Sequence, residues 1–252
     1  MTRSDYFLHV LDQADSTNNY AMGLAYADRA AHGEAYFTDH QLQGKGQRGK
    51  QWLAEKGMNI AISIVIKPGS RILADQFGLS VAVAMGCYEF YKNYAGDETS
   101  IKWPNDIYWR DRKAGGILIE NIIGNAGPAN PRWKYAVAGI GMNINQVRFD
   151  DALPNPVSLR QITGRQFQPK ELARELHIRV MHWVDAWIQQ KNSHHLQAYN
   201  EVLFRRNAEV TMRKNGIAFR TKVREVLENG KLLTTDLIDN HFSFGEVEWI
   251  LD

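Results

Sequence analysis

The chain has 252 residues, 44 % of them hydrophobic, enough to bury the core of one large domain or of one domain with a small second one. Its formal net charge of +2 is too near zero for a general nucleic-acid binder. The single cysteine, Cys87, excludes an intramolecular disulfide, and its apolar neighbours predict a core residue rather than a catalytic thiol. Acidic residues near the start argue against a signal peptide, and no apolar run approaches the about 20 residues of a membrane span. We therefore expect a soluble, cytoplasmic protein.

The first hundred residues alternate between predicted strands and helices. Strands are expected over residues 6–11, 34–38 and 58–67, the last being an apolar run interrupted only by Ser63. Side chains typical of a helix N-terminus predict a helix from residue 15 to about residue 29. A second helix is predicted from residue 74, with apolar residues at helical spacing and Gly96 just past its end.

The middle of the chain predicts paired strands. They are expected over residues 101–109, interrupted by Pro104 and Asn105, from residue 115 onward, and over residues 133–138. A hairpin turn is expected at residues 111–113 and a Gly/Pro/Asn loop at residues 125–131. Paired strands together with separate helices predict an α+β fold with a mainly antiparallel sheet and flanking helices.

The last third changes its periodicity. Pro169 begins a predicted long helix, and its apolar residues at helical spacing include Trp183 and Trp187, which we interpret as core. After Asn207 the pattern has period two, with turns predicted at residues 215–216 and 229–230. This tail is expected to be a small all-β domain of five strands, similar to an SH3 barrel. We place the domain boundary between residues 204 and 205.

Residues 39–52, called the glycine-rich loop below, predict an anion-binding loop. Their central part holds three glycines and the three cations Lys45, Arg48 and Lys50. Glycine lets backbone N–H groups approach a ligand closely, and cations add charge-assisted hydrogen bonds to phosphate oxygens. A plain solvated turn remains an alternative. A P-loop is disfavoured because Gln51 stands where the magnesium-binding hydroxyl is needed, and the residues before the loop are too polar for a buried strand.

Three further segments carry candidate chemistry. Residues 102–106 combine a cation, an amide and a carboxylate around a proline, which fixes the direction of its neighbours; a rigid turn is the alternative. Lys113 precedes two glycines and could stabilise charge that develops in acyl activation, or it could be a solvated hairpin lysine. Asn143 follows a glycine-rich strand end and could read an adenine edge. The adjacent His194 and His195 are expected to be exposed rather than metal ligands.

Taken in chain order, these segments resemble the biotin–protein ligases. The matching motifs are Asp15-Ser16-Thr17-Asn18, Gly44-Lys45-Gly46-Gln47-Arg48-Gly49, Lys102-Trp103-Pro104-Asn105-Asp106, Lys113-x-Gly115-Gly116-Ile117-Leu118 and Gly139-x-Gly141-x-Asn143. No single motif is specific, but the ordered set covers roughly residues 7–145. The resemblance implies a fold like that of biotin ligases and class II aminoacyl-tRNA synthetases, with a catalytic domain over residues 1–204 and an SH3-like domain over residues 205–252.

The resemblance also implies an activity in two steps. Biotin and ATP first give biotinyl-5′-AMP and pyrophosphate. A lysine of a biotin carrier domain, part of a biotin-dependent carboxylase, then attacks this mixed anhydride. Carboxylate and ATP repel each other, so cations must bring them together, and loop closure keeps water from the labile adenylate. The implied protein binds no membrane and no specific DNA, and the choice between monomer and homodimer stays open.

Residue roles follow from the same resemblance, position by position. The residues implied to bind biotin are Ser16, Thr17 and Gln41, with the backbone of Gly115, Gly116 and Leu118 as a wall. The residues implied to act on the phosphate and the incoming lysine are Lys45, Arg48, Asn105, Asp106 and Lys113, with Asp106 also beside Mg²⁺. Asn143 is implied to contact adenine. The remaining members of the implied site are Asn18, Gly44, Gly46, Gln47, Trp52, Lys102, Trp103, Gly139 and Gly141.

Two alternative functions are considered, and the sequence differs from the family pattern at two points. A lipoate–protein ligase shares the fold and the adenylate chemistry, although the glycine-rich loop argues against it; a nucleotide or nucleic-acid binding module would need more surface cations. Only fourteen residues precede Asp15, so we expect a ligase without the DNA-binding domain of bifunctional relatives. Gln47 stands where the family commonly has arginine. We expect Arg48 to turn inward and replace that charge.

Overall fold

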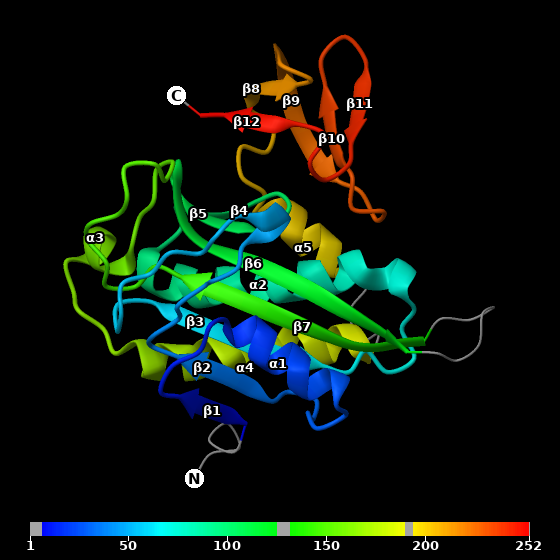
Figure 1. The fold of residues 1–252 in the computed structure, drawn as a ribbon. Helices are drawn as coiled ribbons and strands as arrows, with labels where there is room; N and C mark the ends of the chain where they lie inside the picture. The colour runs from blue at the N-terminus through cyan, green and yellow to red at the C-terminus, as the bar shows by residue number, and fades with distance from the viewer. Residues whose placement is uncertain (1–6, 125–131, 190–193, 252) are drawn as a thin grey trace.

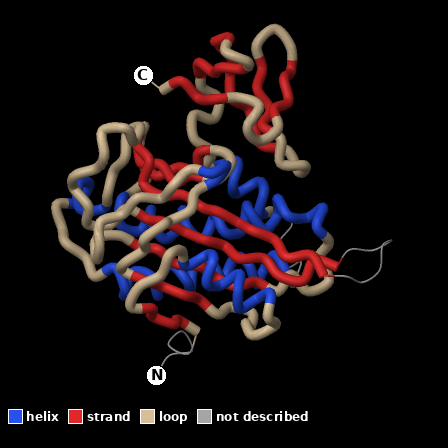
Figure 2. The backbone as a smooth tube through the Cα atoms, viewed as in Figure 1, coloured by secondary structure: helices blue, strands red, loops and turns tan. Residues whose placement is uncertain are grey.

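The computed structural model describes residues 7–124, 132–189 and 194–251, and its largest element is a seven-stranded sheet (Figures 1 and 2). The strand order is β1-β2-β3-β7-β6-β5-β4. β1 and β2 are parallel, and the other neighbours are antiparallel. The strands are β1 Leu8–Leu11, β2 Ala35–Thr38, β3 Ile60–Ile66, β4 Thr99–Lys102, β5 Asp106–Trp109, β6 Arg112–Gly124 and β7 Arg132–Met142. The predicted α+β fold with a mainly antiparallel sheet is confirmed.

Helices cover both faces of this sheet (Figure 1). One face carries α1, and the opposite face carries α2 and α4. The helices are α1 Thr17–Tyr26, α2 Gln76–Ala95, α3 Leu159–Thr163, α4 Pro169–Ile188 and α5 His195–Glu201, with 3₁₀ turns at η2 Gln47–Gly49 and η3 Leu73–Asp75. All residues of β3 are buried, because this strand lies between other strands and is covered on both faces.

The main core lies between the sheet and the pair α2/α4. Gly86 lets these two helices approach closely, since a Cβ there would lie 2.5 Å from the Val180 Cα. Pro169 begins α4, as predicted, and Leu176 and Trp187 are buried in the core with Trp183 packed against it. The interpretation of both tryptophans as core residues is therefore confirmed. Cys87 is also fully buried, and burial raises the pKa of its thiol.

A second, five-stranded sheet forms the C-terminal end of the chain and is called the C-terminal sheet below (Figure 1). Its strand order is β11-β10-β9-β8-β12, antiparallel throughout. The strands are β8 Glu209–Lys214, β9 Ile217–Val226, β10 Leu232–Thr235, β11 Asp239–Phe242 and β12 Glu248–Ile250. Both predicted hairpin turns are present, at residues 215–216 and 229–230, and they confirm the expected SH3-like tail.

The C-terminal sheet shares its apolar core with the rest of the chain. Met212, Val223 and Leu232 belong to the same buried cluster as the residues between α2 and the large sheet. At the junction, the Asn200 side chain of α5 forms two hydrogen bonds with the backbone of Val226: its Nδ2 donates to the carbonyl (2.9 Å) and its Oδ1 accepts from the N–H (2.7 Å). The boundary between residues 204 and 205 stays a prediction, and buried contacts cross it.

Several predicted element ends are wrong. The hairpin turn comes at Arg110 and Asp111, with Arg110 in the left-handed region, so Lys113 already belongs to β6. β7 continues to Met142, and α1 ends at Tyr26 rather than near residue 29. The predicted loop at residues 125–131 lies outside the described residues.

The expectation for the histidine pair is half wrong. His194 is exposed, as predicted, but His195 is buried, with its ring 4.9 Å from that of Trp183. Burial lowers the pKa of His195. Among the described residues, no helix is both long and apolar enough to cross a membrane.

Candidate functional site

A floor of small residues lies on the α1 face of the large sheet. Ser63 of β3 is directly opposite Gly139 of β7, and Ala61 is opposite Gly141, which in turn is opposite Gly116 of β6. Residues directly opposite in neighbouring strands share a face. The glycines let α1 and the glycine-rich loop approach the centre of the sheet closely, since Asn18 and Trp52 occupy the positions that a Cβ on Gly139 and on Gly141 would take.

The N-terminus of α1 adds a buried polar cluster at one side of this floor. Ser16 caps the helix, accepting from the Asn19 N–H. The Gln41 Oε1 accepts from the Thr17 N–H at 2.9 Å and lies 3.3 Å from the Thr17 hydroxyl, which is 2.8 Å from the Ser63 hydroxyl. The structure therefore brings together Ser16, Thr17 and Gln41, the three side chains expected to hold biotin.

Asn18 extends the cluster across the floor. Its Nδ2 donates to Glu120 of β6, and a Cβ on Gly139 would lie 2.6 Å from its Oδ1, so only glycine leaves room for the amide. Among the described residues, no donor reaches this buried Oδ1. A buried acceptor without a donor is uncommon and costly, which marks the position as one where a ligand N–H could bind.

The glycine-rich loop folds into a hairpin over the floor. Its base is closed by the Trp52 N–H donating to the Gly44 carbonyl (2.8 Å) and the Gly46 N–H donating to the Lys50 carbonyl (2.7 Å). The Trp52 ring lies flat against Gly141, in space that a Cβ there would occupy. Within the described chain, the buried indole N–H of Trp52 has no acceptor.

Gln47, at the tip of the loop, points inward. Its Nε2 donates to the Ile117 carbonyl of β6 at 3.2 Å, and the Asn105 Nδ2 donates to the same carbonyl at 2.7 Å. Its Oε1 is buried, and no donor in the described residues satisfies it. The unsatisfied polar atoms of Asn18, Gln47 and Trp52 thus all lie against the same short stretch of β6 and β7.

The opposite side of the floor carries a charged pair. The Lys113 Nζ lies 2.7 Å from the Asp106 Oδ1, with 32 % and 21 % of the two side chains exposed, so both are reachable by a ligand. Gly116 lies directly beside the pair, and a Cβ there would be 3.5 Å from the Lys113 ammonium. The sequence placed these residues in separate motifs, and the β5–β6 hairpin unites them.

Asn143 holds Lys113 in place. β6 has a bulge between the residues paired with Ile107 and Tyr108, which leaves Ala114 between two ladder positions. The Asn143 N–H donates to the Ala114 carbonyl (2.9 Å), and its Nδ2 donates to the Lys113 carbonyl (3.3 Å). Asn143 is buried and contacts this bulge in the structure; its contact with adenine stays a prediction.

The residues before Asn105 face the C-terminal sheet. Trp103 is buried, and its indole N–H donates to the Gly230 carbonyl at 3.0 Å. The Lys102 ammonium donates to the Tyr108 hydroxyl at 3.0 Å and lies 5.6 Å from the centroid of the Trp249 ring. Burial lowers the pKa of Lys102 to about 8, because a charged ammonium loses its hydration there.

Arg48 does not turn inward. Its guanidinium lies 5.8 Å from the centroid of the Phe244 ring, and its Nη1 donates to the Gly245 carbonyl at 3.3 Å, both in the C-terminal sheet's β11–β12 connection. Adjacent loop residues thus point in opposite directions, Gln47 to the floor and Arg48 away from it. The expected replacement of the missing arginine charge by Arg48 is not found in this structure.

The geometry on both sides of the floor suits a small molecule with an apolar body, polar groups at one end and an anionic group at the other. Residues 10–129 match the model of the biotin/lipoate A/B protein ligase family. This part of the chain is similar to that family. The matched residues include all the motifs up to Leu118, with the glycine-rich loop and Lys113.

Relatives of known function agree with this assignment. The chain is 32 % identical over 148 residues to the bifunctional ligase/repressor BirA of Escherichia coli, covering 58 % of this chain and 43 % of that protein. It is 31 % identical over 170 residues to the biotin–[acetyl-CoA-carboxylase] ligase of Paracoccus denitrificans, covering 64 % of this chain and 66 % of that protein. The chain thus spans less than half of the bifunctional relative.

Solved structures share the fold over nearly the whole chain. The Aquifex aeolicus biotin protein ligase in complex with biotin and ATP has a TM-score of 0.79 at 21 % identity, covering 97 % of this chain and 99 % of that one. The similarity includes the C-terminal sheet. The large sheet with its helices and the C-terminal sheet therefore occur together in the same architecture elsewhere.

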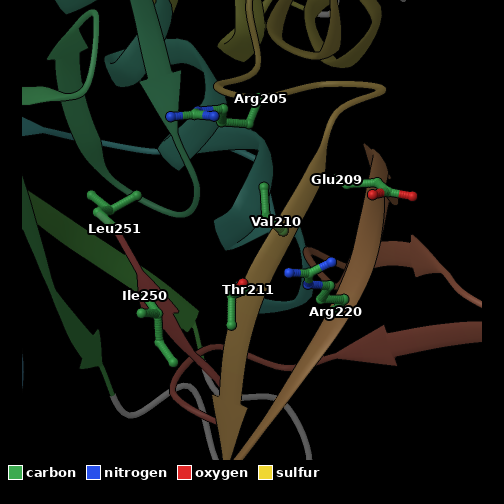
Figure 3. A pocket seen from close by; sticks show the side chains of 7 residues that line it. All are labelled: Arg205, Glu209, Val210, Thr211, Arg220, Ile250 and Leu251. Atoms are coloured by element: carbon green, nitrogen blue, oxygen red, sulfur yellow. The ribbon is translucent and has the colours of Figure 1, made fainter.

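The described residues form hollows in both parts of the chain. One of about 300 Å³ is lined by Gln41 and by Trp52 with the residues that follow it. Another of about 210 Å³ lies by β8 and β12 of the C-terminal sheet, where Arg205, Glu209 and Arg220 supply both signs of charge (Figure 3). Arg205 already pairs with Asp111, so the second hollow offers no concentrated charge for a ligand.

The described residues form no complete site for a resident metal ion. Among the described residues, no three His, Cys, Asp or Glu side chains gather as metal ligands. Asp106 offers one carboxylate, already paired with Lys113. Because Mg²⁺ is often held by one or two carboxylates and by substrate phosphates, Asp106 fits an ion that arrives with a nucleotide rather than a resident one.

Sequence reasoning missed three residues of the site region. Ser63 had a signal, since it is the lone polar residue in a strand buried on both faces. Glu120, the partner of Asn18, had none beyond its place in a predicted strand. Phe244 lies 196 residues after Arg48 and follows no motif, so only the fold could bring them together.

Proposed function

We propose that the chain is a biotin–protein ligase that activates biotin with ATP and transfers it to a lysine of a biotin carrier domain. The observation that carries the proposal is the floor of small residues at positions 61, 63, 116, 139 and 141, with the unsatisfied buried oxygen of Asn18 at one side and the Lys113–Asp106 pair at the other. Relatives named as biotin ligases support the same assignment.

Biotin fits the buried end of this floor. Its ureido group has two N–H donors and one carbonyl acceptor. The unsatisfied acceptor at this end is the Asn18 side-chain oxygen, and the hydroxyls of Thr17 and Ser63 can donate or accept. The bicyclic body would lie beside the Trp52 ring, which itself covers Gly141, with its carboxylate directed toward Lys113.

The first chemical step joins two anions. The biotin carboxylate oxygen attacks the α-phosphorus of ATP, a new O–P bond forms, and pyrophosphate leaves. Lys113 would lie between carboxylate and phosphate, reducing their repulsion and stabilising the charge that develops in the transition state. Asn143 contributes indirectly, because its hydrogen bond to the Lys113 carbonyl fixes the bulge from which this side chain projects. Lys45 would bind phosphate oxygens from the loop.

The second step transfers the acyl group. The uncharged amine of a carrier lysine attacks the acyl carbon, an amide bond forms and AMP leaves, with the amine proton passing to solvent or to a nearby base. Asp106 is the carboxylate beside the reacting centre and would orient the incoming amine. The carrier is expected to be the biotin domain of a biotin-dependent carboxylase, and Mg²⁺ would accompany ATP, with Asp106 as one ligand.

The test is binding of radiolabelled biotin with and without ATP, followed by addition of a carrier domain. The proposal requires tight, ATP-dependent retention of label and its transfer to the carrier. Competition by unlabelled biotin but not by lipoate would separate the two activities of the family. Retention of lipoate instead, or no nucleotide dependence, would contradict a biotin ligase.

A further inference from the structure

The outward direction of Arg48 raises the question of what this cation does. The glycine-rich loop is held at two adjacent residues: Gln47 by the Ile117 carbonyl on the inside, and Arg48 by the Gly245 carbonyl on the outside. Arg48 also has a positive φ of 56°, uncommon for a residue with a side chain. The backbone conformation thus sends neighbouring side chains to different parts of the molecule.

Phe244 is the common contact of two separate segments of the site. On one side the Arg48 guanidinium lies 5.8 Å from its ring centroid. On another the Trp103 ring meets it edge to face, with centroids 6.3 Å apart and planes at 81°. Trp103 leads directly into Asn105 and Asp106. One aromatic ring of the C-terminal sheet therefore connects the glycine-rich loop to the segment that carries the candidate catalytic carboxylate.

The local backbone is shaped for this contact. Gly245 has a φ of 83°, and a Cβ there would occupy the position of the Arg48 guanidinium. Phe244 itself is 49 % exposed, so it is not a core residue whose burial explains its size. A half-exposed aromatic ring beside a glycine that admits a cation forms a small receptor for the arginine side chain.

We propose, on the basis of the function proposed above, that Phe244 is a positioning residue through which the C-terminal sheet anchors the outer side of the glycine-rich loop. With the loop fixed over the floor by Gln47 inside and Arg48 outside, the adenylate is kept from solvent until the carrier arrives. Arg48 serves as the anchor and not as a ligand of the phosphate.

If Arg48 were instead a phosphate ligand, removing the Phe244 ring would have the opposite effect on adenylate retention. If Arg48 leaves Phe244 to clamp the phosphate when ligand binds, then removing the Phe244 ring frees Arg48 and leaves adenylate retention unchanged or longer. If Phe244 anchors the loop, removing the ring shortens retention. A single variant, Phe244→Ala, therefore separates the two roles.

The experiment uses the full chain loaded with labelled biotin and ATP, then chased with unlabelled biotin while release of label is followed. Loss of an exposed cation–π contact predicts release from Phe244→Ala about two- to fivefold faster than from wild type. Phe244→Tyr should restore slow release, and Phe244→Leu should not, because leucine fills space without an aromatic face. Leu237→Ala, at a fully exposed position in the β10–β11 turn, is the matched control and should release label at the wild-type rate.

Two further measurements complete the test. Arg48→Gln should release label at least as fast as Phe244→Ala, because it also loses the hydrogen bond to the Gly245 carbonyl, and the double variant should be no faster than Arg48→Gln alone. Trypsin cleavage at Lys45 and Lys50 in the ligand-free protein should speed up in Phe244→Ala. Release and cleavage equal to wild type in Phe244→Ala would overturn the anchor. Absence of labelled adenylate in wild type would instead overturn the proposed function, and the cleavage comparison would still decide the anchor.

Discussion

The two faces of the seven-stranded sheet are made by the same strands with opposite choices of side chain. Toward α2 and α4, β3 and β7 present isoleucines, alanines and Met142, packed without polar groups. Toward α1, the same strands present Ser63, Gly139 and Gly141. This difference shows how the candidate site is built. On one face, small residues let α1 and the glycine-rich loop approach the sheet, and on the other face, packed apolar side chains stabilise the fold.

The largest effect is expected from removing an apolar side chain on the face of the sheet that packs against α2 and α4. Leu176→Ala in α4 leaves a cavity at a fully buried position and should lower the free energy of unfolding by about 2–5 kcal/mol. Biotin affinity of the fraction that remains folded should stay near wild type. Chemical denaturation and biotin titration on one preparation check both, and a large loss of affinity in folded protein would refute the division.

The next largest effect belongs to the open face. Lys113→Ala removes the ammonium beside Asp106 and should slow adenylate formation about 10²–10³-fold, the usual loss for a group that stabilises developing charge. The thermal midpoint should change little. Lys134→Ala on β7, which breaks an exposed ion pair with Asp28, is the control and should exchange pyrophosphate normally. Wild-type exchange in Lys113→Ala would remove this residue from the mechanism.

Filling the floor should have an intermediate effect. Gly139→Ala places a methyl group 2.6 Å from the Asn18 Oδ1, and because Asn18 is tied to Glu120, the crowding should cost about 1–3 kcal/mol of biotin binding or stability. Gly23→Ala in α1 meets nothing within 4 Å and should raise stability by about 0.4–1 kcal/mol. Calorimetric titration with biotin and thermal melts distinguish them; equal behaviour of the two variants would mean that the floor has no special need of glycine.

The smallest expected effect concerns the loop. Because Arg48 is directed to Phe244, the charge missing at Gln47 is not replaced, and Gln47→Arg should slow adenylate release. A charged hydrogen bond in place of a neutral one gains about 1 kcal/mol, or about fivefold in release rate. The chase experiment measures it. Unchanged release would show that another cation, such as Lys45, already supplies the interaction.

Several strands, helices and turns were predictable because their sequence patterns are local. The apolar run of β3, the helical spacing of α4 and the two Asn-Gly turns each depend on a few neighbouring residues. Element ends were less predictable: Arg110 takes a left-handed conformation that glycine usually supplies, which moved the turn by one residue and put Lys113 inside a strand. His195 was misjudged because its burial comes from Trp183 of another helix.

The candidate site divides in the same way. Ser16, Thr17 and Lys113 could be placed by motif, and the fold brings them to one face. What Asn143 contacts could not be inferred, because its amide bonds to a bulge that pairing between β5 and β6 creates. The direction of Arg48 could not either, since it depends on a ring nearly 200 residues away and on the space that Gly245 leaves.

The two hydrogen bonds between the Asn200 side chain and Val226 give the chain one further property. They have the donor–acceptor pattern of an adjacent strand. The hydrogen bonds of β9 therefore continue beyond Glu209, the first residue of β8, to the Asn200 side chain of helix α5. Opening the C-terminal sheet must therefore break bonds that also hold the helical layer. The Val226 amide proton should exchange with deuterium only when the whole chain opens, and melting should proceed as a single cooperative transition.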